Sequence, residues 1–574
     1  MVTVSALRAF YYSISAACLF LCVPAAFGVD YFPISDIRPG LKGIGRTVFS
    51  GSKVEQFDVE VLGVLENAGP KQSIILARLS GGPLERTGVM QGMSGSPVYI
   101  DGKLAGAVAM AFPFSKEPIA GIRPIAEMLA GGDTGHPRAV QAKVNHGGSE
   151  LVDLSTPISF NGFTKATLDA FRPQLQALGL DPRQGLSAGR QPPEHRKAEP
   201  LEPGSMISVQ LITGDMSVGA DGTVTHIDGN RVYAFGHRFL SVGPTDVPFT
   251  RASVLALLPN ISTSFKISAS GDWLGAITSD RNAAVAGEIG RRPRMTPVTI
   301  SVAGAAKPVK YTMEMAQDRL LSPMLLQMMI YSALDATERT LGSGAIRIRG
   351  EIAFDSMADP LRFDTVHSGD FNVPLQTALA TAMPLGYALQ NSVDELKVKQ
   401  VDITLDSFTE KKQASIENAW LSRKEARPGE RVDVIVEIAG EGGTRTKHKL
   451  AYDIPVGAPV GTLYFTIGDG PTVNAAEQRY FGVGQPKPAR ELISFLNSLR
   501  PNTKGYVRVW RSDTAYQIDG KDLPDPPASI GLILSRTQTG TSTTPRTSTI
   551  AEMVFGAGDL ALSGSKTVQL EIKE

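Results

Sequence analysis

The stretch Gln91-Gly-Met-Ser-Gly-Ser-Pro97 runs directly into Val98-Tyr-Ile-Asp-Gly-Lys-Leu104, and together they predict a loop that enters a β-hairpin. Asp101-Gly102 is typical of a two-residue hairpin turn. Small residues around Ser94 let the backbone turn tightly and leave the serine hydroxyl uncovered. A nucleophilic serine needs this geometry, together with backbone N–H groups that point at a developing oxyanion. A small-residue turn without any chemistry is the alternative interpretation.

The composition favours a turn-rich β protein with several domains. At 574 residues the chain is too long for one core, and about three to five domains are expected. The chain contains 58 glycines and 38 prolines, more than a helical protein normally uses. It has 57 basic and 57 acidic residues, so its charge balance predicts no nucleic-acid partner.

Residues 1–28 have the pattern of a secretory signal peptide. A basic residue precedes an apolar run over 14–26, which is too short for a membrane span. Cys18 and Cys22 both lie inside this segment, so the mature chain would contain no cysteine. Lipid attachment at either cysteine is a poorer alternative, because the preceding residues fit it badly. We therefore expect an exported protein of the periplasm, extracellular space or cell envelope, with no stable membrane span after signal removal.

Each of two β-rich segments contains a polar residue that lies beside small residues. Phe57-Asp-Val-Glu-Val61 alternates apolar and acidic residues, which is typical of a half-buried strand in the segment that contains Ser94. In the second segment, the predicted strand Arg231–Phe235 leads to His237, which Gly236 exposes at the strand end. None of the seven histidines has a metal-ligand spacing to another, so we predict no metal and no cofactor.

Shifts in composition and periodicity divide the chain into six parts. An amphipathic helix is predicted over 167–180, followed by a Pro/Gly-rich linker over 181–204 that is suited to proteolytic nicking. Alternating apolar residues over 432–438 favour a β-sandwich near the C-terminus. The predicted parts are a signal peptide (1–28), a serine-bearing β unit (29–135), a helix and linker (136–204), a histidine-bearing β unit (205–310), an α+β segment (311–410) and a C-terminal β-sandwich-like domain (411–574).

Several motifs resemble the SpoIVB-type serine peptidases, exported enzymes first known from spore formation. The resemblance implies a mainly β fold in which two chymotrypsin-like β-barrel halves form a protease core. It also implies Ser94 as nucleophile, His237 as general base, the N–H groups of Gly92 and Ser94 as oxyanion hole, and a protein or peptide substrate. The motifs lie at residues 54–61, 87–97, 101–108, 222–225, 233–237 and 279–281.

The sequence departs from that family in three respects. The histidine half precedes the serine half in the family, whereas here the order is reversed, which a site defined by spatial geometry tolerates. The family's acidic residue lies before the serine, but Leu79-Ser-Gly-Gly-Pro83 holds no carboxylate. The orienting acid would then be Asp246 or Asp280, or it would be absent. No PDZ module of the kind that the family carries is recognisable.

Three hypotheses remain open from the sequence. The first is an exported serine endopeptidase that works through an acyl-enzyme. The second is a protease-like fold that has lost turnover and serves as a binding or scaffold protein of the cell envelope, with a partner for the C-terminal sandwich. The third pairs Ser94 with Lys103 as base, although Lys103 follows the hairpin turn and would point away from the serine loop.

Overall fold

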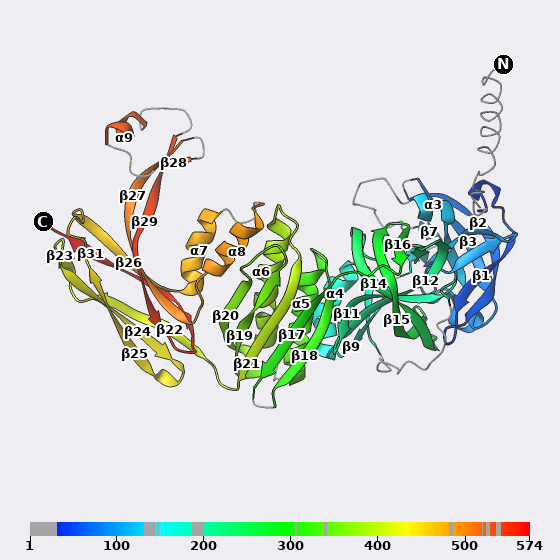
Figure 1. Ribbon diagram of the computed structural model, residues 1–574, viewed down its shortest axis with the longest axis horizontal. Coiled ribbons are helices and arrows are strands. Elements are labelled where there is room, and N and C mark those ends of the chain that lie inside the picture. Colours follow the sequence, from blue (N-terminus) through cyan, green and yellow to red (C-terminus); the bar gives the residue numbers. More distant parts are fainter. Residues whose placement is uncertain are drawn as a thin grey trace, which may run out of the picture.

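The computed structural model arranges the chain as a row of β-rich bodies (Figure 1). It is 55% strand and 19% helix, which confirms the mainly β prediction. The predicted signal peptide and residues 186–199 of the predicted linker lie outside the described residues. The structure describes residues 31–69, 71–130, 144–146, 149–154, 156–185, 200–304, 307–337, 341–481, 486–518, 521–523, 528–534 and 541–574.

The serine-bearing unit is a closed barrel of six strands. Closure occurs because β4 pairs with β1 on one side and with β5 on the other. In β2, Phe57, Val59 and Val61 point into the barrel core, and the acidic residues between them face outward. In order around the barrel, the strands are β1 (Lys42–Val48), β2 (Val54–Gly69), β3 (Gln72–Ser80), β6 (Ile119–Pro124), β5 (Lys103–Ala111) and β4 (Pro97–Ile100).

The histidine-bearing unit is a second ring of six strands. It closes because β11 pairs with both β12 and β14. Phe235 and Phe249 are among the fully buried side chains that fill it. In order around the ring, the strands are β11 (Met206–Gly214), β12 (Ser217–Asp228), β13 (Arg231–Ala234), β16 (Ala284–Ile289), β15 (Phe265–Arg281) and β14 (Gly243–Leu258).

The long β14–β15 hairpin of the second barrel reaches the first barrel. Val254 and Gly51 exchange backbone hydrogen bonds of 2.7 and 2.8 Å. Val48 of the first barrel packs into a small apolar cluster with Met206, Ala252 and Val254 of the second. The two barrels therefore share a packed junction.

The segment predicted as helix and linker also contains strands, which corrects that prediction. Strands β7 (Val144–His146) and β8 (Ser149–Asp153) extend the first sheet. Strand β9 (Thr156–Asn161) pairs with β12, and β10 (Leu180–Gln184) runs parallel to β9. The predicted helix is present as α4 (Lys165–Ala177). Strand β10 went unrecognised because its proline and charged residues are untypical of a strand.

The central body continues the sheet of the second barrel. Strand β18 pairs with β11 and with β17, so one sheet crosses the boundary that the sequence places at residue 310. Helices α5 and α6 pack against each other and against this sheet. The elements are β17 (Met295–Ala303), β18 (Val309–Ala316), α5 (Leu321–Thr337), β19 (Leu341–Phe354), β20 (Leu361–Phe371), α6 (Val373–Asn391) and β21 (Val398–Phe408).

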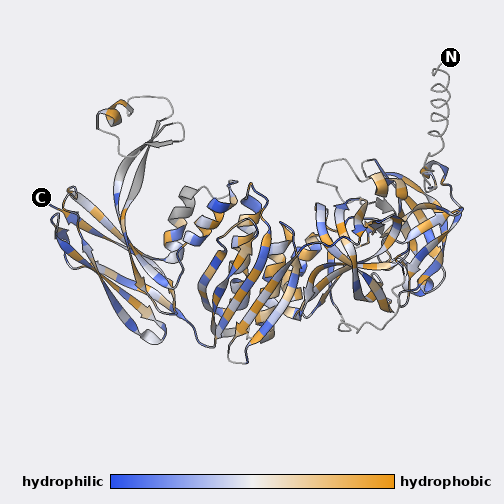
Figure 2. Cartoon of the chain, in the orientation of Figure 1, coloured by the Kyte–Doolittle hydropathy of each residue, from blue (hydrophilic) through white to orange (hydrophobic). Residues whose placement is uncertain are grey.

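The C-terminal body packs two sheets around an apolar core. Orange and blue residues alternate along its strands (Figure 2). One sheet contains β22 (Gln413–Leu421), β24 (Arg431–Gly440), β25 (Arg445–Asp453) and β30 (Ala561–Ser563). The other contains β23 (Glu425–Ala426), β26 (Gly461–Asp469), β27 (Lys504–Ile518), β28 (Lys521–Leu523), β29 (Thr541–Gly556) and β31 (Ser565–Ile572).

The remaining helices are short. In the C-terminal region, α8 joins the core of the central body through Ala489 and Ile493. None of the helices within the described ranges has both the length and the apolar composition that crossing a membrane requires. These elements are η1 (Ile34–Asp36), α2 (Leu84–Thr87), α3 (Ile125–Ala130), η2 (Glu441–Gly443), α7 (Gly470–Phe481), α8 (Ala489–Ser498) and α9 (Ala528–Leu534).

Candidate active site

The serine loop turns through two left-handed glycines. Gly92 has φ = +90° and Gly95 has φ = +92°, a region that side chains with a Cβ disfavour. At Gly95 a Cβ would lie 2.0 Å from the carbonyl oxygen of Thr223. The N–H of Gly95 donates to the carbonyl of Val108 on β5 at 2.7 Å. Glycine is therefore required at position 95 by both the backbone angle and the close approach of β12.

The second barrel holds this loop of the first barrel directly. The N–H of Thr223 donates to the carbonyl of Ser94 at 2.8 Å. The hydroxyl of Thr223 donates to the carbonyl of Gly92 at 2.9 Å, and that of Thr225 to the carbonyl of Gly95 at 2.7 Å. All these groups are buried, so the conformation around Ser94 depends on contact between the barrels.

Two backbone donors of the loop have no acceptor within the described part of the chain. Among the residues that the structure describes, none accepts a hydrogen bond from the N–H of Gly92 or from that of Ser94. Buried N–H groups are normally paired, because an unpaired one forfeits its hydration. These are the two groups that the resemblance assigns to the oxyanion hole.

A second tight turn carries His237. Phe235 and Gly236 are both left-handed, with φ = +71° and +68°. A Cβ at Gly236 would lie 3.1 Å from the carbonyl oxygen of Val108, the residue that also bonds Gly95. The N–H of Phe235 donates to the carbonyl of Thr223 at 3.2 Å, and the N–H of Thr223 donates to Ser94. Val108 and Thr223 thus each contact both turns, which brings the serine and histidine segments together.

The backbone carbonyl of the next residue, Arg238, orients the imidazole of His237. Its Nδ1 lies 2.6 Å from the carbonyl oxygen of Arg238, and since a carbonyl only accepts, Nδ1 carries the proton. The neutral ring then presents the lone pair of Nε2. Burial lowers the pKa of His237 below its ordinary value, which favours this neutral form.

Two buried polar atoms at this junction have no hydrogen-bond partner among the described residues. Ser94 is 1% exposed and His237 is 2% exposed, so the expectation that their small neighbours leave them uncovered is wrong, because the second barrel packs over the loop. Neither Ser94 Oγ nor His237 Nε2 has a hydrogen-bond partner within the described part of the chain. Such atoms cost free energy when they are buried, and they are found where reactive groups are needed.

Asp280 and Asp246, the two residues predicted as the orienting acid, have other partners than His237. Asp280 is buried, and its carboxylate accepts the N–H groups of Phe239 (2.8 Å), Leu240 (2.6 Å) and Val242 (3.3 Å). It anchors the loop after His237 rather than the imidazole. Asp246 forms a partly exposed ion pair with Arg291 at 3.0 Å. Among the described residues, neither carboxylate forms a hydrogen bond with His237, whose Nδ1 bonds the carbonyl of Arg238.

Asp153 is the carboxylate whose charge acts on His237, and the sequence did not indicate it. It ends β8, which pairs with β5 at Met110, and it lies 4.0 Å from the buried guanidinium of Arg123. Burial is the largest influence on the pKa of His237 and lowers it; the charge of Asp153 raises it, and the charges of Arg123 and Arg238 lower it. Only the tertiary pairing of β8 with β5 brings this residue near the site, so sequence spacing gave no signal for it.

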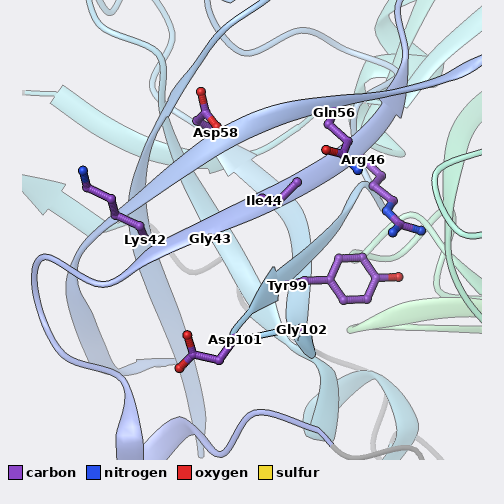
Figure 3. A pocket seen from close by; sticks show the side chains of 9 residues that line it. All are labelled: Lys42, Gly43, Ile44, Arg46, Gln56, Asp58, Tyr99, Asp101 and Gly102. Atoms are coloured by element: carbon purple, nitrogen blue, oxygen red, sulfur yellow. The ribbon is translucent and has the colours of Figure 1, made fainter.

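Two other features lie apart from this junction. Lys103 is exposed at the start of β5, whereas Ser94 is buried, so the geometry gives no support to the lysine-base hypothesis. A hollow of about 510 Å³ lies on the outer face of the first barrel, and its lining includes Arg46 and Tyr99 (Figure 3). The Arg46 guanidinium lies 5.1 Å from the centre of the Tyr99 ring. Neither Ser94 nor His237 lines this hollow.

The paired barrels are consistent with a β-barrel protease core. Residues 34–128 match the model of the SpoIVB peptidase S55 family, which confirms the resemblance to SpoIVB-type serine peptidases. The matched segment contains Ser94 and ends before His237. At the level of the family, the match indicates a serine peptidase. A search of curated proteins and a search of solved structures found no match.

Proposed function

We propose that the protein is an exported serine endopeptidase with Ser94 as nucleophile and His237 as general base. The observation that carries the proposal is the pair of buried atoms, Ser94 Oγ and His237 Nε2, which lack partners within the described chain and lie on two turns joined through Val108 and Thr223. Export rests on the signal-like residues 1–28 and on the resemblance to an exported family.

The chemistry would follow from these groups. His237 Nε2 takes the hydroxyl proton as Ser94 Oγ attacks the peptide carbonyl, and the N–H groups of Gly92 and Ser94 bind the oxyanion. The imidazolium then returns its proton to the leaving amine, which leaves an ester on Ser94. Water, activated by the same imidazole, hydrolyses this ester and restores the serine.

The orienting group would be a backbone carbonyl rather than a carboxylate. The carbonyl of Arg238 fixes the tautomer of His237, as the acid does in a triad, but it carries no full charge. The charge of Asp153 favours the imidazolium, although the guanidinium of Arg123, 4.0 Å from that carboxylate, acts against it. This arrangement supports a dyad with a more distant acid.

The burial of both residues supports a regulated site. With Ser94 1% exposed and His237 2% exposed, a protein substrate reaches the serine only after covering residues move. The same closure, together with the lack of a carboxylate bonded to His237 in the described chain, favours the second candidate function, a protease-like binding or scaffold protein of the cell envelope. The two candidates differ in whether the serine reacts.

A fluorophosphonate probe separates them. We expect the purified mature protein to be labelled, and Ser94→Ala and His237→Ala to lose labelling by about 10³-fold or more. Lys103→Ala is the matched control for the lysine-base hypothesis and should label like the wild type. Folded wild type that resists labelling, even after limited proteolysis has opened the site, would support the binding-protein alternative. Labelling that persists in Ser94→Ala would refute the assignment of the nucleophile.

A further inference from the structure

A lysine and an aspartate are buried together at the barrel junction. Lys266, near the start of β15, and Asp221, on β12, are each 3% exposed. The N–H of Lys266 donates to the carbonyl of Gln91, the first residue of the serine loop, at 3.2 Å. The hydroxyl of Ser268 donates to the carboxylate of Asp221. The mechanism above uses neither charged group.

The ammonium of Lys266 bonds the first barrel. Its Nζ donates to Thr47 Oγ1 on β1 at 2.8 Å, and Ser96 Oγ donates to the same oxygen at 3.0 Å. Thr47 and Ser96 are both fully buried. The lysine therefore connects β15 of the second barrel to β1 of the first and, through Thr47, to a loop residue close to Ser94.

The methylene groups of Lys266 pack against Gly92. A Cβ at Gly92 would lie 3.2 Å from Lys266 Cδ and 3.4 Å from its Cβ. The ammonium is only two bonds beyond that Cδ. The amine is thus carried by a side chain that packs against Gly92, one of the two residues whose N–H groups are assigned to the oxyanion hole, in surroundings where water screens a charge little.

Stability alone does not account for a lysine and an aspartate that are buried at one junction with no salt bridge between them. Removing two charges from water costs more than their attraction usually returns, so apolar replacements are often neutral or stabilising. Burial lowers the pKa of Lys266 to about 7 and raises that of Asp221 to about 6. Each charge partly opposes the shift of the other, and no other charged side chain in the described residues acts on either.

We infer that Lys266 is a positioning residue for the oxyanion loop and that its charged form is the active one. This inference rests on the proposed function. The charged amine holds Thr47, Ser96 and Gly92 in place and favours negative charge at the serine. Loss of its proton removes that charge and leaves the carboxylate of Asp221 without a compensating cation. Serine reactivity should therefore decline as pH rises through neutrality.

The test is the rate of fluorophosphonate labelling between pH 5 and pH 9. The wild-type rate should rise as His237 loses its proton and fall as Lys266 loses its proton. Lys266→Met should label at least tenfold more slowly at neutral pH and should lose the alkaline fall while keeping the acid limb. Asp221→Asn should move the alkaline fall to lower pH, because removing the anion makes Lys266 easier to deprotonate.

The controls separate this inference from folding and from the proposed function. Lys310→Met changes an exposed lysine on β18 and should leave the profile unchanged. Near-ultraviolet circular dichroism must match the wild type for each variant, and Asp221→Asn serves if Lys266→Met does not fold. An alkaline fall that both Lys266→Met and Asp221→Asn retain unchanged would overturn the inference alone. Wild type that never labels would overturn the proposed function first.

Discussion

The barrel junction and the C-terminal sandwich both exclude water, but they bury different kinds of side chain. The junction buries a serine, a histidine, a lysine and two aspartates, each less than 4% exposed (Ser94, His237, Lys266, Asp221 and Asp280). The core cluster of the sandwich is apolar, with Val432, Val434 and Val436 among its fully buried members. Charged side chains of the sandwich also form pairs on the outside, as Lys449 does with Asp433, and the buried Asp469 at the end of β26 accepts backbone N–H groups.

This difference bears on what each region is for. Apolar burial stabilises a domain without desolvating charge, and the core cluster of the sandwich relies on it. Burying ionisable groups at the junction lowers the stability of the fold. Proteins keep such buried groups mainly where a functional site requires them. The comparison therefore predicts large and pH-dependent effects at the junction and small ones on the sandwich surface.

The largest structural effect should come from Gly95→Ala. A Cβ there would overlap the Thr223 carbonyl, which costs about 1–3 kcal/mol, and the left-handed backbone adds about 1 kcal/mol. We expect labelling of Ser94 to be lost and hydrogen exchange of β12 to accelerate. Gly102→Ala is the control, because Gly102 is also left-handed but a Cβ added there would have no neighbouring atom within 4 Å. Equal effects of the two changes would contradict the packing argument.

The next largest effect is a pH dependence of the free energy of unfolding that arises at the junction. The pKa of Lys266 is about 7 in the folded chain and near 10.5 when it is unfolded. Between these values the unfolded chain binds a proton that the folded one lacks, so stability rises with pH from about 7 to about 10. The gain is on the order of 1.4 kcal/mol for each unit of pKa difference.

Hydrogen exchange corrected for intrinsic rates can measure this gain region by region. Peptides of β12 and β15 should become better protected from pH 7 to pH 9 in the wild type but not in Lys266→Met. Peptides of β24 should not respond in either protein. Lys449→Met, which removes an exposed sandwich lysine, is the matched control. A gain that survives in Lys266→Met would assign the titration to another group.

The contrast between local and long-range contacts explains which features could be predicted from the sequence. Local alternation predicted β2 and β24 correctly, because burying one face of a strand leaves a period of two. The glycine-flanked Ser94 and His237 were also visible, since tight turns require small residues. These features depend only on neighbours along the chain.

The rest of the site depends on pairings between distant segments. Asp153 approaches His237 only because β8 pairs with β5, and Lys266 meets Thr47 across 219 positions of sequence. Asp280 lies in one of the motifs that resemble the family, but its carboxylate accepts hydrogen bonds from backbone N–H groups of the loop after His237. No periodicity or spacing encodes such contacts, so the acid could not be chosen from the sequence.

A smaller effect is expected from Asp153→Asn. Removing this negative charge lowers the pKa of His237, because the anion favours the imidazolium. The acid limb of the labelling profile should move to lower pH, with a rate loss of about two- to tenfold at neutral pH. Asp246→Asn is the control. It should change neither the acid limb nor the labelling rate, since Asp246 pairs with Arg291 on the surface. A shift with Asp246→Asn but not with Asp153→Asn would restore the acid expected from sequence.

The smallest effect should be found on the sandwich surface. Arg431 and Asp453 form an ion pair at 2.7 Å, yet their side chains are 67% and 68% exposed. Water and salt screen such a pair, and holding two mobile side chains together costs entropy that offsets the attraction. Arg431→Ala should therefore change neither the exchange of β24 nor the labelling of Ser94. Val434→Ala, in the same strand, creates a cavity in the core and should accelerate exchange of β24 and β25. If the exposed pair mattered as much as the buried valine, charge would contribute to the sandwich as it does to the junction, and the distinction between the two regions would fail.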